Sequence, residues 1–117
     1  MSFGEYFKTI RKEKKKTQGD IAKAINKSTM LVSGVESGKN GPFIHDDLIK
    51  ICDYLELNDV ERDRLIIEAA VERGGIPDYL VAYMREFKNV YRLLYTLKKK
   101  NYNDIEISEL IDKLEEK

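Results

Sequence analysis

A chain of 117 residues with a single cysteine has the length of one small globular protein and cannot carry an internal disulfide framework. Its 21 Lys and Arg balance its 21 Asp and Glu, so an overall basic charge cannot be the basis of any nucleic-acid affinity. No apolar run has the length of a transmembrane span, and the first residues lack the charged-then-apolar order of a signal peptide. We therefore expect a cytoplasmic protein with no membrane partner.

The charge is distributed unevenly along the chain. Residues 1–45 carry a net charge of +5, residues 46–79 carry −6, and residues 80–117 carry +1. Binding to a phosphate backbone needs local positive potential rather than a basic whole, and the first segment offers it. The run Lys14–Lys16 has a second explanation, because cations at the C-terminal end of a helix are favourable without DNA.

Helical patterns begin at the N-terminus. Phe3, Phe7 and Ile10 recur with helical spacing and predict a helix up to about Lys14. No segment alternates apolar and polar residues over the length of a strand, so the sequence predicts an all-α fold.

Residues 17–39 predict two short helices joined by a sharp turn. Thr17 is a good N-cap for the first helix, and Ser28 is a good N-cap for the second. Asn26 stands between the two helices, where the chain must turn, and asparagine tolerates a left-handed backbone better than other non-glycine residues. Gly38 supplies the end of the second helix.

The second of these helices has two different faces. Leu31, Val32 and Val35 form an apolar stripe that we expect to be buried. The opposite face is small and uncharged, and it consists of Thr29, Met30, Ser33 and Gly34.

The stretch TQGDIAKAINKSTMLVSGVESGK resembles the Cro/CI-type helix-turn-helix of the XRE family of phage lambda-repressor-like transcriptional regulators. The similarity extends from Phe3 to about Arg73. It implies a five-helix lambda-repressor-like DNA-binding domain whose third helix, at about residues 28–36, enters the major groove. Arg11 and Glu36 match a pair that the family uses as a structural ion pair.

The resemblance also implies which residues contact DNA. Two of the base-facing positions differ from the polar residues that often stand there in the family, since they are Met30 and Gly34. The residues expected to face bases are Thr29, Met30, Ser33 and Gly34, and those expected to contact phosphates are Gln18, Ser28, Lys39 and Asn40.

Two further helices complete the predicted DNA-binding domain, which spans residues 1–73. Asp46 and Asp47 are expected to open the first of them. Asn58 followed three residues later by Glu61 resembles a capping box for the second.

Residues 74–117 form a predicted helical C-terminal region with three short amphipathic helices. Pro77 suits the first turn of one helix, Asn89 can cap the next, and Ser108 or a residue just before it starts the last. Three short helices cannot easily bury all their apolar surface among themselves, so we expect either packing onto the first domain or dimerisation. The dimerisation candidates are Tyr83, Phe87, Tyr91 and Leu94. An alternative is that such aromatic side chains form the internal core of a second subdomain.

The sequence offers little for catalysis. His45 is the only histidine, and we expect it to be a helix cap or a surface loop residue. Cys52 shares a helical face with Leu48 and Leu55, which favours a buried apolar role over a reactive thiol. We expect no enzyme, no cofactor and no metal site.

The sequence therefore predicts a transcriptional regulator that binds specific double-stranded DNA sequences, foremost a homodimeric repressor on a palindromic operator, in the nucleoid-associated part of the cytoplasm. Two alternatives stay open. One is an antitoxin-like or other protein-interaction module with a second protein partner, whose DNA binding is autoregulatory. The other is an effector-gated regulator, whose ligand pocket would be lined by Tyr79, Tyr83, Phe87 and Tyr91.

Overall fold

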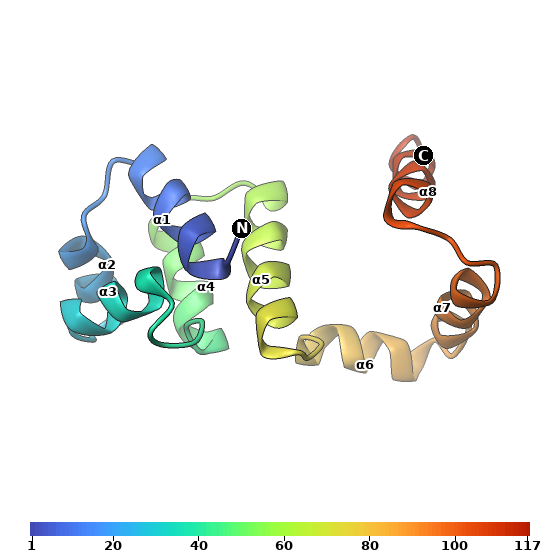
Figure 1. Cartoon of the computed structure of the whole chain (residues 1–117), viewed down its shortest axis with the longest axis horizontal. Helices are drawn as coiled ribbons and strands as arrows, with labels where there is room; N and C mark the ends of the chain where they lie inside the picture. Colours follow the sequence, from blue (N-terminus) through green and yellow to red (C-terminus); the bar gives the residue numbers. More distant parts are fainter. The chain divides into compact units, whose positions relative to one another are not determined.

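The computed structural model describes residues 1–117 and contains helices but no strand, so the predicted all-α class is confirmed (Figure 1). In chain order the helices are α1 (Phe3–Glu13), α2 (Gln18–Ile25), α3 (Thr29–Ser37), α4 (His45–Tyr54), α5 (Asp59–Arg73), α6 (Asp78–Glu86), α7 (Asn89–Lys99) and α8 (Asp104–Glu115). None of these helices is long and apolar enough to cross a bilayer.

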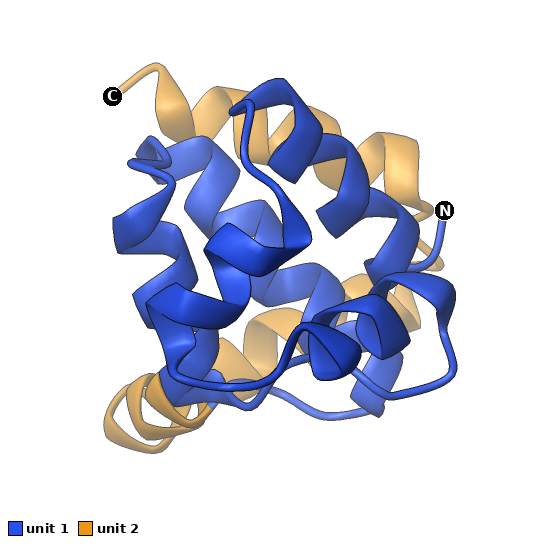
Figure 2. Cartoon of the chain, turned by 90° about the vertical axis from the view of Figure 1, so that its left-hand side faces the viewer, with its two compact units in different colours: residues 1–77 blue, residues 78–117 orange.

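The chain divides into two compact units (Figure 2). Unit 1 spans Met1–Pro77 and contains α1–α5, while unit 2 spans Asp78–Lys117 and contains α6–α8. Sequence reasoning placed the division after residue 73.

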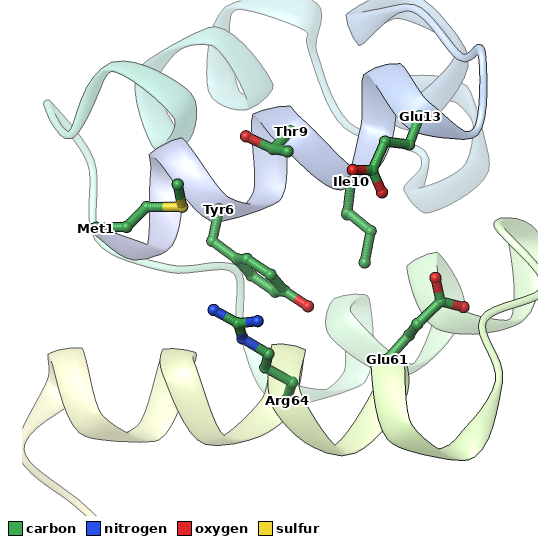
Figure 3. A pocket seen from close by; sticks show the side chains of 7 residues that line it. All are labelled: Met1, Tyr6, Thr9, Ile10, Glu13, Glu61 and Arg64. Carbon is green, nitrogen blue, oxygen red and sulfur yellow. The ribbon is translucent and has the colours of Figure 1, made fainter.

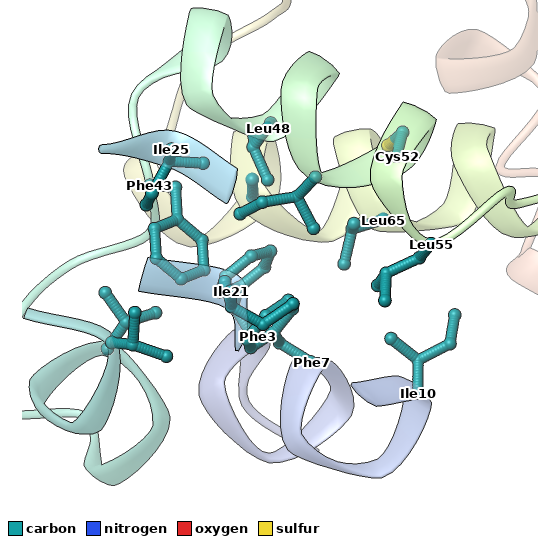
Figure 4. Close-up of a cluster of buried hydrophobic side chains, with 14 of the residues drawn as sticks. Phe3, Phe7, Ile10, Ile21, Ile25, Phe43, Leu48, Cys52, Leu55 and Leu65 are labelled. Atoms are coloured by element: carbon teal, nitrogen blue, oxygen red, sulfur yellow. The ribbon is translucent and has the colours of Figure 1, made fainter. Parts of the chain in front are cut away.

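Unit 1 is built around an aromatic and aliphatic core to which all five of its helices contribute (Figure 4). Three phenylalanine rings lie together at its centre: the Phe7 and Phe43 centroids are 4.9 Å apart, and the Phe3 and Phe43 centroids are 6.1 Å apart, both in edge-on contact. Cys52 is fully buried in this core, and its burial raises the pKa of the thiol, which confirms the predicted apolar role.

Four of the five helices in unit 1 begin with a residue whose side chain accepts a capping hydrogen bond, and α4 is the exception. Asn58 and Glu61 form the predicted capping box of α5, and the hydrogen bond from the Asn58 backbone N–H lowers the pKa of the Glu61 carboxyl. The helix α4 begins at His45, one residue before the predicted Asp46. Its N-cap is Ile44, which has no side-chain oxygen to accept a hydrogen bond.

Two predicted helix starts in unit 2 are wrong. Asn89 does not cap α7 but is its first helical residue, and Lys88 precedes it without a capping hydrogen bond. The helix α8 begins at Asp104 rather than near Ser108, because Asn103 accepts a hydrogen bond from the Glu106 N–H and donates one back to the Glu106 carboxylate.

Unit 2 has helices but no buried core. None of the residues of α6, α7 or α8 is buried, and each helix keeps large apolar side chains exposed. This 40-residue unit therefore lacks the burial of apolar side chains that normally stabilises a fold.

Candidate nucleic-acid interface

The segment α2–turn–α3 is held together by its own capping groups. The Thr17 hydroxyl accepts from the Asp20 N–H, and the Thr17 N–H donates to the Asp20 carboxylate, which lowers the pKa of Asp20. Asn26 ends α2 with φ 55° and ψ 46°, in the left-handed region. Ser28 then caps α3 by accepting from the Leu31 N–H at 3.1 Å. The turn predicted from Asn26 and Ser28 therefore rests on local hydrogen bonds.

A buried ion pair joins α1 to the end of α3. The Arg11 guanidinium donates to both carboxylate oxygens of Glu36, from Nε at 2.6 Å and from Nη2 at 2.9 Å, and each residue is only 7% exposed. The remaining Arg11 nitrogen, Nη1, donates to the Lys16 carbonyl at 2.7 Å. Hydrogen bonding to Glu36 raises the pKa of Arg11.

The carboxylate of Glu36 also reaches the first residue of α2. Gln18 Nε2 donates to Glu36 Oε1 at 3.1 Å, so α1, α2 and α3 meet at one side chain. Gln18 is half-buried at the N-terminal end of α2. This network fixes how α3 is presented on unit 1.

Gly4 has a structural role that sequence reasoning missed. A Cβ built on this residue would overlap the Val35 carbonyl oxygen and lie 2.7 Å from the Glu36 oxygen. Only glycine allows α1 to come this close to the C-terminal part of α3. A single sequence contains no signal for such an approach, because a glycine near a helix start has several ordinary explanations.

The outward face of α3 carries three of the four residues expected to face bases. Thr29, Met30 and Ser33 are exposed, and Met30 is 82% exposed despite its apolar side chain. Ser37 lies on the same side of the helix by spacing and is exposed as well, although its hydroxyl donates to the Gly34 carbonyl at 3.2 Å. Sequence reasoning did not single out Ser37.

Gly34, the fourth residue expected to face bases, differs from the other three in its surroundings. Gly34 is buried, and the three atoms closest to a Cβ built on it all belong to the side chain of Asn40. The chain after α3 folds back, and the Asn40 N–H donates to the Gly34 carbonyl at 2.9 Å. The Asn40 side chain, which was expected to contact a phosphate, therefore covers the place of the missing Gly34 side chain.

The lysines between Lys12 and Lys39 fall into two groups. Three have partners within unit 1: Lys14 bonds Glu61 at 3.3 Å, Lys16 lies 5.1 Å from the Tyr54 ring centre, and Lys27 is 3.8 Å from Asp47. The exposed lysines without an ion pair are Lys12, Lys15, Lys23 and Lys39. The second group is available to attract phosphates without losing an existing contact.

A pocket of about 260 Å³ lies elsewhere, between α1 and α5 (Figure 3). Its main feature is the Arg64 guanidinium, which stacks 4.5 Å from the centre of the Tyr6 ring, while burial raises the pKa of Tyr6. This contact braces α1 against α5. No group of three or more His, Cys, Asp and Glu side chains lies close enough together to hold a metal ion.

Comparison with known families gives one match. Residues 2–65 match a family model described as a helix-turn-helix domain. The matched segment is more than half of the 117 residues and contains the whole of α1–α4, including the face described above. Neither the curated proteins nor the solved structures contain a significant match.

Proposed function

The chain belongs to the family of helix-turn-helix domains, and we propose that it is a sequence-specific transcriptional regulator of the XRE, or Cro/CI, type that acts as a homodimeric repressor. One observation carries this proposal. The Glu36 carboxylate binds Arg11 and Gln18 and so supports an uncharged outward face of α3, in a unit whose exposed lysines include Lys39 directly after this helix. A major groove accepts such a helix, and the phosphates flanking the groove attract such lysines.

In the proposed complex, α3 lies in the major groove with Thr29, Met30 and Ser33 towards the base edges. A threonine or serine hydroxyl can donate to or accept from a base edge, and an apolar side chain can pack on the methyl group of thymine. The 82% exposure of Met30 supports this role, because covering a large apolar side chain that is otherwise in water stabilises the complex.

Phosphate contacts would come from helix N-termini and from lysine. The first residue of α2 is Gln18, and Ser28 caps α3, so backbone N–H groups and the positive ends of both helix dipoles lie at these residues. Lys39 follows the C-cap of α3 and is exposed. These contacts would set the position of α3 on the duplex without distinguishing sequences.

Changing Met30 or Thr29 should alter which sequences are bound. For Met30→Ala we expect a loss of about 1 kcal/mol of preference for a thymine at one position, and for Thr29→Ala a comparable loss at a neighbouring position. Mobility-shift titration of the promoter next to its own gene, with single base-pair changes, measures both.

The matched control for these variants is Val60→Ala. Val60 is 78% exposed on α5 and lies outside the proposed interface, so its variant should bind every duplex as the wild type does. Equal loss of affinity for all duplexes in Met30→Ala would contradict a base-facing position for that residue.

Lys39→Ala should weaken binding to all duplexes alike. Removing one phosphate contact lowers the slope of log K against log salt by about one unit, and Lys39→Arg should restore the slope because it keeps the charge. Titrations at several salt concentrations, on the promoter duplex and on an unrelated one, test this expectation. A slope that is the same in Lys39→Ala and in the wild type would place Lys39 away from the DNA.

Unit 2 is the proposed dimerisation region, and its partner would be unit 2 of a second copy of this chain. The proposed contacts are half-exposed in one copy: Tyr83, Phe87, Tyr91 and Leu94 are 55%, 50%, 49% and 49% exposed. The Tyr83 and Phe87 rings already lie 5.2 Å apart, so they offer a preformed aromatic surface.

Charge supports a second copy rather than another partner. The helix α7 has three basic residues and no acidic one, whereas α8 has five acidic residues and one lysine. Between the two helices an apolar groove of about 370 Å³ is lined mainly by leucine and isoleucine side chains, together with Lys113 and Lys117. In a two-fold bundle with α7 beside α8 of the other copy, every neighbouring pair of helices carries opposite charge.

A further inference from the structure

Asn40 is seated on α3 in the place where Gly34 has no side chain. A Cβ on Gly34 would overlap Asn40 Nδ2 and lie 2.8 Å from Asn40 Cγ. The amide of Asn40 therefore rests directly against the helix backbone. Gly34 is one turn beyond Met30, so this seat adjoins the outward face of α3.

The backbone keeps Asn40 at this seat. Gly38 ends α3 in the left-handed conformation, with φ 81°, and turns the chain back along the helix. The Asn40 N–H then donates to the Gly34 carbonyl at 2.9 Å, and the same carbonyl accepts from the Ser37 hydroxyl at 3.2 Å. Because the backbone of Asn40 is already fixed, binding a partner restricts only its side-chain torsions and costs little conformational entropy.

The side-chain amide of Asn40 has no partner in the chain. Asn40 is exposed, and its side chain makes no hydrogen bond within the chain. Both its donor and its acceptor are therefore without a partner in the free protein, beside the outward face of α3. This availability contrasts with Gln18, whose amide nitrogen already donates to Glu36.

We propose that the side-chain amide of Asn40 recognises an adenine in the major groove and acts as a specificity-determining residue of α3. An asparagine amide matches adenine in both directions, since its nitrogen donates to N7 and its oxygen accepts from the N6 amino group. A phosphate would use only the donor and would gain nothing from a neutral residue over a lysine. The inference rests on the proposed DNA-binding function and replaces the phosphate contact first expected for Asn40.

Asn40→Ala should remove the preference for adenine at one base pair while keeping the rest of the bound sequence. The full chain and its variants would each select from a pool of random duplexes, and the enriched sequences would be compared. We expect a loss of roughly 5- to 150-fold discrimination at that pair, as for a bidentate amide contact. Lys39→Ala should enrich the same sequence as the wild type, since it removes only a phosphate contact.

Gly34→Ala provides a second route to the same result. Its methyl group would displace the Asn40 amide, so the preference at the same base pair should fall. In the Asn40→Ala background that obstacle is gone, and adding Gly34→Ala should change the selected sequence no further.

Two outcomes would overturn the role of Asn40 alone: an unchanged enriched sequence in Asn40→Ala, or equal weakening on every duplex. A wild-type chain that enriches no sequence would instead overturn the proposed function, and this inference with it.

Discussion

Glu36→Ala should lower the free energy of unfolding of the protein by about 3–5 kcal/mol and abolish specific DNA binding. The substitution would leave the Arg11 guanidinium buried with the Lys16 carbonyl as its one remaining partner. A buried charge without its counter-charge is among the most destabilising defects that a single substitution can create. Urea denaturation followed by circular dichroism measures the loss, and mobility shift measures the effect on binding.

A double replacement distinguishes the unpaired charge from the lost contact. Arg11→Met with Glu36→Leu removes both charges and keeps apolar volume, so this pair should cost much less than Glu36→Ala alone. The double variant should also show weaker specific binding, because Gln18 loses the partner of its Nε2. If Glu36→Ala and the double replacement cost the same, the energy would lie in packing rather than in the paired charges.

The helix ends show how far local chemistry can be predicted. The Asn58–Glu61 box was recognised because Asn and Glu three residues apart satisfy backbone groups without any help from the rest of the fold. Asn103 and Glu106 have the same spacing and form the same box, although the last helix was expected to start near Ser108. Asn101, two residues before the N-cap, adopts a left-handed backbone with φ 57° and separates α7 from this box. The start of α8 was therefore predictable from its residues.

The positions of Gly4, Gly34 and Asn40 were beyond such reasoning. Gly4 is required by the approach of a helix that comes some 30 residues later in the chain. Gly34 and Asn40 meet because the chain reverses after Gly38. The spacing of apolar residues in a helix does not predict the path of the loop that follows it. The pairing of Arg11 with Glu36 came from the family resemblance alone, since spacing does not bring residues 25 apart together.

Unit 2 presents the opposite situation. Its amphipathic patterns predicted helices, and helices are present, but the patterns do not say what each apolar face packs against. In unit 1 the partner of each stripe lies within the same unit, whereas no residue of α6–α8 is buried. Such helices gain most of their stability from tertiary or quaternary packing, so the stability of unit 2 should depend on what covers it.

Leu94→Glu should therefore convert the proposed dimer to a monomer and lower the affinity for the palindromic duplex by about 10²–10⁴-fold, because two linked half-site contacts become independent. Leu94 is 49% exposed, so its replacement leaves the core of unit 1 untouched. Light scattering gives the solution mass, and mobility shift gives the affinity.

The matched control is Ile105→Glu, which adds the same charge at a residue that is 72% exposed. By helical spacing Ile105 lies across α8 from Leu110 and Leu114, which line the groove, so its variant should stay dimeric. Loss of the dimer in Leu94→Glu with its retention in Ile105→Glu would assign the interface to the face of α7 that carries Leu94. A wild-type mass that stays monomeric as concentration rises would contradict the dimer, and the same apolar surface would then have to serve a second protein or an effector.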